Sequence, residues 1–185
     1  MPQIMRRAIC TAILAVAPLT GQWASAEVVT AVANGFEIHQ TAHTSASPDK
    51  VYAQLLLPAH WWNPEHTFTG NAGNLTLDAR AGGCWCETLP AGGSVEHLRV
   101  VNVQPGKFLR LRGALGPFQG LAVDGVMTWS VKGVADGTDI SITYVVGGYV
   151  KDGLAGMADM TDKVLGEQVE RLKKLADGET VTKGH

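Results

Sequence analysis

The sequence predicts an α+β fold: a curved antiparallel sheet of about seven strands wrapped around one long C-terminal helix, with two short helices after the first strand. Apolar and polar residues alternate between Asn74 and Tyr149, which is typical of half-buried strands. Apolar residues then recur every three or four positions between Asp152 and Asp177, which is typical of an amphipathic helix. A sheet with one apolar face needs a cover, and this helix is the large element available to supply it.

The first 26 residues have the order of a secretory signal peptide. Arg6 and Arg7 precede an apolar run from Ala8 to Leu19, and Ala24-Ser25-Ala26 offers a cleavage site of small residues. The apolar run is about 12 residues long, short of the roughly 20 that span a bilayer, so a retained anchor is the weaker alternative. We therefore expect residues 1–26 to be removed and the chain to be exported, periplasmic or secreted, without stable membrane insertion.

The remaining residues suit a single domain over 27–178, followed by a flexible tail over 179–185. Loss of Arg6 and Arg7 changes the formal net charge from −2 to −4. A mildly acidic chain without basic clusters argues against nucleic acid as a partner. Nothing in the sequence indicates which protein partners or oligomeric state to expect.

The segment from Glu27 to Thr44 alternates loosely and is predicted to form the first strand. Ser47-Pro48-Asp49 then supplies an N-cap, a proline at the first helical position and an acid in the first turn, which together predict a short helix. Pro58 ends that helix, and a second short helix fits before Asn63-Pro64.

Turns divide the alternating region into six strands, which we place at 74–80, 84–89, 95–103, 107–113, 122–133 and 138–148. Each strand is joined to the next by a short connection, so an antiparallel meander is the most economical topology. Asp152 is a candidate N-cap for the final helix, and Gly178 is a candidate for its end.

The order of elements over residues 30–176 resembles the START-like, or SRPBCC, superfamily, whose helix-grip fold is shared with pollen allergens and lipid-transfer domains. The stretches SPDKVYAQLLLPAHWWNP and VVNVQPGKFLRLR are similar to bacterial relatives of the heat-shock ATPase activator and to polyketide-cyclase-like proteins. The resemblance implies a pocket for a small hydrophobic or lipid-like molecule, without a metal or other cofactor. It transfers no catalytic residue, because the superfamily includes carriers, receptors, cyclases and cochaperones.

Tryptophans dominate the predicted pocket. Trp61 and Trp62 follow the short helix, where this fold borders the pocket mouth, and neighbouring helical side chains diverge so far that at most one can face the cavity squarely. Core packing is the alternative for both. The other residues that we expect to line the pocket are Trp85, Met127, Trp129, Tyr144, Leu154 and Met157.

Cys84 and Cys86 share one face of a predicted strand, with Trp85 on the other face. On an extended strand their Cα atoms would be about 6.6 Å apart, near the upper end of disulfide geometry. We therefore expect two small packed side chains, with a strained disulfide as an alternative. A metal site that adds His97 is a further alternative, although a second pair of cysteines is missing.

The pairing of this strand with the next one is open. A hairpin that turns at residues 90–93 places Cys86 opposite His97 and Cys84 opposite Arg99. A register shifted by one residue pairs Glu87 with His97 instead and avoids placing Glu87 opposite Glu96.

His66 and Glu87 are the candidates for acid–base catalysis, because His titrates near neutral pH and Glu can accept a proton. Their spacing matches no known dyad or triad, so solvated loop residues are the alternative. The leading interpretation is therefore an exported binding protein with little or no catalytic activity. A cyclase- or dehydratase-type enzyme is the second interpretation, and a thiol or metal function at Cys84 and Cys86 is the third.

Overall fold

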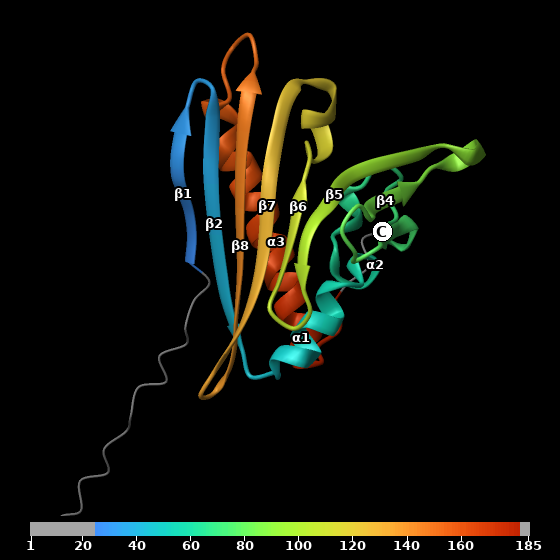
Figure 1. Ribbon diagram of the computed structural model, residues 1–185, viewed down its shortest axis with the longest axis vertical. Helices are drawn as coiled ribbons and strands as arrows, with labels where there is room; N and C mark the ends of the chain where they lie inside the picture. The colour runs from blue at the N-terminus through green and yellow to red at the C-terminus, as the bar shows by residue number, and fades with distance from the viewer. Residues whose placement is uncertain (1–24, 182–185) are drawn as a thin grey trace, which may run out of the picture.

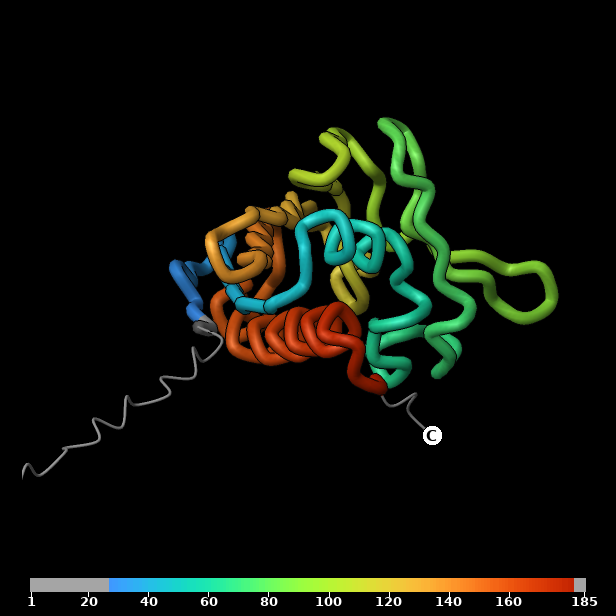
Figure 2. Tube along the Cα trace, turned by 90° about the horizontal axis from the view of Figure 1, so that it is seen from below, coloured from blue at the N-terminus to red at the C-terminus, as the bar shows by residue number. Residues whose placement is uncertain are grey.

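The computed structural model describes residues 25–181 and confirms the predicted helix-grip architecture. Its strands form one antiparallel sheet in the order β1-β2-β8-β7-β6-β5-β4-β3, and helix α3 (Ala158–Asp177) runs along the concave side (Figures 1 and 2). The strands are β1 (Ser25–Val32), β2 (Gly35–Thr44), β3 (Leu75–Leu77), β4 (Cys84–Thr88), β5 (Ser94–Gln104), β6 (Phe108–Arg112), β7 (Ala122–Val134) and β8 (Gly137–Tyr149). Two short helices, α1 (Pro48–Leu55) and α2 (Pro58–Trp61), follow β2 as predicted.

The predicted first strand is a hairpin, so the sheet has eight strands and not about seven. The chain turns at Ala33 and Asn34, and the Asn34-Gly35 dipeptide is a strong local signal for a tight hairpin that the loose alternation obscured. The predicted signal segment lies outside the described residues except for Ser25 and Ala26, which begin β1.

The long helix begins later than predicted, and Asp152 does not cap it. Gly153 adopts a φ of +80°, which is incompatible with a helix, and the N–H of Leu154 donates to the carbonyl of Ala33 at 2.9 Å. A short 3₁₀ turn, η5 (Ala155–Met157), then leads into α3. The predicted end is confirmed, because Gly178 takes the left-handed conformation with φ +87°. None of the described helices is long and apolar enough to span a bilayer.

The core lies between the concave face of the sheet and α3. On β8 the predicted alternation holds, and Ile140, Ile142, Tyr144 and Val146 are all buried. Helix α3 meets this face with the apolar stripe that includes Leu165, Val169 and Leu172. Burial of this apolar area is the main term that stabilises the fold.

Tyr144 connects the core to the loop that follows β6. Its hydroxyl donates to the carbonyl of Gly113 at 3.1 Å and accepts the N–H of Leu115 at 3.1 Å. Burial raises the pKa of Tyr144 to about 12, so the phenol stays protonated. Gly125 leaves room for the ring, because a Cβ there would lie 2.6 Å from Tyr144 Cε2. The loop at 113–118 is thereby fixed from inside the core.

We predict that Gly125→Ala destabilises the protein by about 1–3 kcal/mol, because the added methyl group must displace the Tyr144 ring. Urea unfolding measures the change in the free energy of unfolding. Gly120→Ala is the matched control, since a Cβ at Gly120 meets no atom within 4 Å among the described residues. Equal stability of the two variants would contradict this account of Tyr144.

Candidate functional site

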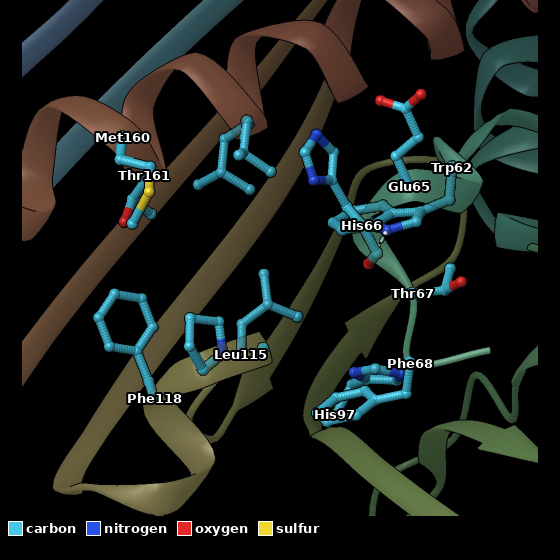
Figure 3. A pocket seen from close by; sticks show the side chains of 14 residues that line it. Trp62, Glu65, His66, Thr67, Phe68, His97, Leu115, Phe118, Met160 and Thr161 are labelled. Atoms are coloured by element: carbon cyan, nitrogen blue, oxygen red, sulfur yellow. Dashed lines mark hydrogen bonds between the residues drawn. The ribbon is translucent and has the colours of Figure 1, made fainter. Parts of the chain in front are cut away.

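A cavity of about 450 Å³ lies between the first half of α3, the 3₁₀ turn η4 (Gly116–Gly120) and the loop that follows α2 (Figure 3). Most of its lining is apolar, and its few polar side chains come chiefly from that loop. The lining residues are Trp62, Glu65, His66, Thr67, Phe68, His97, Leu115, Gly116, Pro117, Phe118, Met160, Thr161, Val164 and Leu165. Its volume falls within the roughly 300–1,000 Å³ typical of small-molecule pockets.

Polar contacts with α3 hold the loop that forms one wall. The N–H of Asn63 donates to Gln168 Oε1 at 2.8 Å, and Asn63 Nδ2 donates to Glu167 Oε1 at 2.6 Å. Arg171 Nε donates to the carbonyl of Trp61 at 2.7 Å. The wall is therefore tied to the helix at several points.

The cavity mouth has an apolar rim. Phe68 is 55% exposed and Met160 is 56% exposed, so two large side chains face solvent at the entrance. Figure 3 shows Met160 on α3, on the other side of the cavity from Phe68. An apolar molecule could therefore begin to lose its hydration shell at the rim.

The polar side chains near the mouth already have partners or face solvent. His66 Nε2 lies 3.3 Å from Glu167 Oε2 and Thr67 donates to the carbonyl of Pro64 at 2.7 Å. Thr161 donates its hydroxyl to the carbonyl of Met157 at 2.8 Å. His66, the histidine that the sequence suggested for catalysis, is thus exposed and lies beside Glu167 of α3.

Glu87 and His97 form a buried pair at the inner end of the site. Glu87 Oε2 accepts hydrogen bonds from His97 Nε2 at 2.9 Å and from the N–H of Phe68 at 3.0 Å, and Oε1 accepts the N–H of Thr69 at 2.7 Å. Burial favours the neutral acid, but the hydrogen bonds from Thr69, Phe68 and His97 outweigh it and lower the pKa of Glu87. Glu87 is therefore ionised at neutral pH, and both of its oxygens accept hydrogen bonds.

His97 is neutral beside this carboxylate. Burial lowers the pKa of His97, and the hydrogen bond and charge of Glu87 offset this only in part. A carboxylate can only accept, so Nε2 carries the imidazole proton and Nδ1 carries a lone pair. Within residues 25–181, His97 Nδ1 has no hydrogen-bond partner.

A β-bulge brings the pair together. Cys84 lies opposite Arg99, as in the first predicted register, but the pairing shifts between Trp85 and Cys86, so that neither predicted partner of His97 lies directly opposite it. The extra residue in β5 is His97. His97 and its neighbour Leu98 are both buried, whereas neighbours on a regular strand point to opposite faces. A bulge changes the direction of a side chain, and here it turns His97 to the face of the sheet that carries Glu87.

Cys84 and Cys86 form a disulfide, which corrects the expectation of two separate packed thiols. Their Cα atoms are 5.4 Å apart, closer than the extended strand assumed for the prediction and within the usual range for a disulfide. The bonded sulfurs do not act as thiolate ligands. No cluster of three or more potential metal-ligating His, Cys, Asp or Glu side chains occurs in the described part of the chain.

Of the predicted pocket residues, Trp62 lines the cavity and the others pack in or against the core. Trp62 lines the cavity, whereas Trp61 packs behind it against Trp129, with ring centroids 5.4 Å apart. Met157 is partly buried and packs against the core. The other predicted lining residues are fully or almost fully buried in the core: Trp61, Trp85, Met127, Trp129, Tyr144 and Leu154.

Sequence reasoning did not place the walls formed by Leu115 to Phe118, by Phe68, or by Val164 and Leu165. A usable signal was present in LGPF (115–118), where two large apolar residues flank a Gly-Pro turn instead of continuing a strand. Large apolar residues in a loop indicate that the loop packs against another part of the protein or a ligand, which the alternation of the strands does not reveal.

Residues 35–177 match the model of the family described as "Polyketide cyclase / dehydrase and lipid transport". The chain belongs to this family. The match confirms the resemblance to SRPBCC proteins and the assignment of a ligand-binding fold. No protein of curated function matches the sequence significantly.

Solved structures share the fold of this family member. Protein MLL2253 from Mesorhizobium loti is 19% identical with a TM-score of 0.55, over 78% of this chain and 99% of that one. CalU16 from Micromonospora echinospora is 13% identical with a TM-score of 0.54, over 86% and 88%. DynU16, from the dynemicin biosynthetic locus, is 18% identical with a TM-score of 0.53, over 77% and 48%. At these identities the similarity shows the fold alone.

The buried imidazole makes a prediction about acid stability. The folded pKa of His97 lies below its unfolded value near 6.5, so below that pH the unfolded state binds more protons and the free energy of unfolding falls towards the folded pKa. Glu87 affects the free energy of unfolding at lower pH. Its stabilising contribution is fully present above about pH 4.3 and is lost as the pH falls through its lowered folded pKa.

We therefore expect His97→Gln to lose less stability than the wild type between pH 7.5 and pH 5.5, as measured by urea unfolding. His39→Gln is the control, since His39 is exposed on β2. Equal pH dependence in the wild type and His97→Gln would contradict a neutral buried imidazole.

The disulfide predicts a mass difference. When the protein is purified without reductant, the proteolytic peptide that holds Cys84 and Cys86 should be lighter than its reduced form by the mass of two hydrogen atoms. Cys84→Ser is the control and should leave Cys86 as a thiol that an alkylating reagent labels. Labelling of both cysteines in unreduced, denatured wild type would contradict the bond.

Proposed function

We propose that the protein is an exported binding protein for a small hydrophobic or lipid-like molecule, held in the cavity between α3, η4 and the loop after α2. The observation that carries this proposal is the cavity itself, which is of ligand size and mainly apolar in its lining. The disulfide between Cys84 and Cys86 supports export, because such bonds persist in oxidising compartments.

The lining of the cavity favours a ligand with an apolar body over a highly charged ligand. Glu65 and His66, at the mouth, are exposed, and Glu167 contacts both His66 and Asn63. Deeper in the cavity the walls are apolar residues such as Leu115, Phe118 and Leu165. A ligand with an apolar body therefore gains most from entering.

Extraction of the purified exported protein into organic solvent, followed by mass spectrometry, tests this function directly. The expected result is a small apolar compound in about equimolar amount with the protein. The cavity-filled variant Val164→Trp, described below, should carry none.

A second candidate function is that of an acid–base enzyme of the cyclase or dehydratase type. The Glu87–His97 pair favours it, since an ionised carboxylate that orients a neutral imidazole is a common arrangement for a general base. The acid–base candidates are then Glu87 and His97, whereas the sequence suggested Glu87 and His66. Loss of turnover in His97→Gln with ligand binding retained would favour the enzyme over the carrier.

We predict that Val164→Trp weakens binding of the neutral fluorescent probe N-phenyl-1-naphthylamine about tenfold or more, because the indole fills the cavity. Lys163→Trp is the matched control, since Lys163 is the exposed neighbour on the same helix and its side chain does not line the cavity. Unchanged affinity in Val164→Trp, with both variants folded by circular dichroism, would contradict the proposed site.

A further inference from the structure

Five buried polar side-chain atoms lack a hydrogen-bond partner among the described residues. They are Tyr52 Oη, Gln54 Oε1, Trp85 Nε1, His97 Nδ1 and Trp129 Nε1. Of these, His97 is the one residue that also lines the cavity. An unsatisfied buried polar atom beside a ligand-sized cavity calls for a functional explanation.

The partner of the other ring nitrogen determines what His97 Nδ1 can do. Glu87 is ionised and accepts from Nε2, so the imidazole proton is on Nε2 and the free nitrogen is an acceptor. Glu87 is in turn fixed by the N–H groups of Phe68 and Thr69, so the imidazole cannot easily turn around. The pair therefore presents one acceptor of defined position.

We propose that His97 Nδ1 accepts a hydrogen bond from a hydroxyl group of the bound molecule, so that the site selects apolar ligands that carry a phenol, enol or alcohol over the corresponding ethers. The inference rests on the proposed binding function and names the ligand class that the cavity takes. A buried acceptor discriminates strongly against an analogue without the donor, because that analogue leaves the acceptor unpaired.

The other polar side chains that line the cavity have less need of a ligand donor. Unlike His97 Nδ1, the hydroxyls of Thr67 and Thr161 already have a hydrogen-bond partner, because each donates to a main-chain carbonyl, and His66 lies beside Glu167 near the mouth. Glu65 is exposed to solvent. His97 is 4% exposed, so a hydrogen bond to it would form away from competing water.

Phe68 packs against His97. Its ring lies against the imidazole, with centroids 5.8 Å apart (Figure 3). The Phe68 backbone is held by Glu87, but its side chain is 55% exposed, so the ring can turn outward without moving the loop. A ligand that enters from the mouth reaches His97 by displacing this ring.

The test compares 2-naphthol with 2-methoxynaphthalene, which has the same ring system but no hydroxyl proton. Isothermal titration calorimetry near pH 7 should show that the wild type binds 2-naphthol about tenfold or more tightly than the ether. In His97→Phe, which keeps an aromatic ring but no acceptor, the two affinities should become equal through weaker binding of 2-naphthol.

Long-range ¹H–¹⁵N spectra of the wild type give a second measurement that does not depend on a variant. They should show the Nε2–H form of His97, and 2-naphthol should shift the Nδ1 resonance while the ether leaves it in place. Equal binding of both compounds by the wild type, or an unshifted Nδ1 at saturating 2-naphthol, would overturn this inference and leave the binding function standing. Failure of both compounds to bind would overturn the binding function too.

Discussion

One helix cannot cover a sheet of eight strands, and the site follows from this constraint. Strands lie about 4.8 Å apart, so eight of them span about 34 Å, whereas a helix with its side chains is about 10 Å across. Helix α3 packs on β1, β2 and β8, whereas α1 packs on β7 and β8 and α2 packs on β3. Trp61 and Trp62 extend this second cover onto Trp85 of β4 and Trp129 of β7. The cavity lies where these two covers meet.

The second determinant is a local irregularity. The bulge in β5 turns His97 to the inner face, where Glu87 fixes its tautomer and also anchors the loop that carries Phe68. The disulfide of Cys84 and Cys86 lies on β4 beside the same irregularity. The bulge and the buried carboxylate therefore determine together the position of one polar acceptor in a mainly apolar site.

The sequence predicted what depends on local periodicity and could not predict what depends on a single-residue irregularity. The alternation of Ile140, Ile142 and Tyr144 determines which face of β8 is buried, and this held. The inward turn of His97 depends on the bulge, which no hydrophobic pattern reveals. The cavity walls depend on long-range hydrogen bonds, such as that from Leu115 to Tyr144, that join residues far apart in sequence.

The central claim is that the space beside α3 is an apolar binding cavity, and a crystal pressurised with xenon tests it most directly. Xenon occupies apolar cavities and avoids well-hydrated polar ones. The account predicts a xenon site bounded by Leu115, Phe118, Val164 and Leu165. Ordered water in that space and no xenon would contradict it.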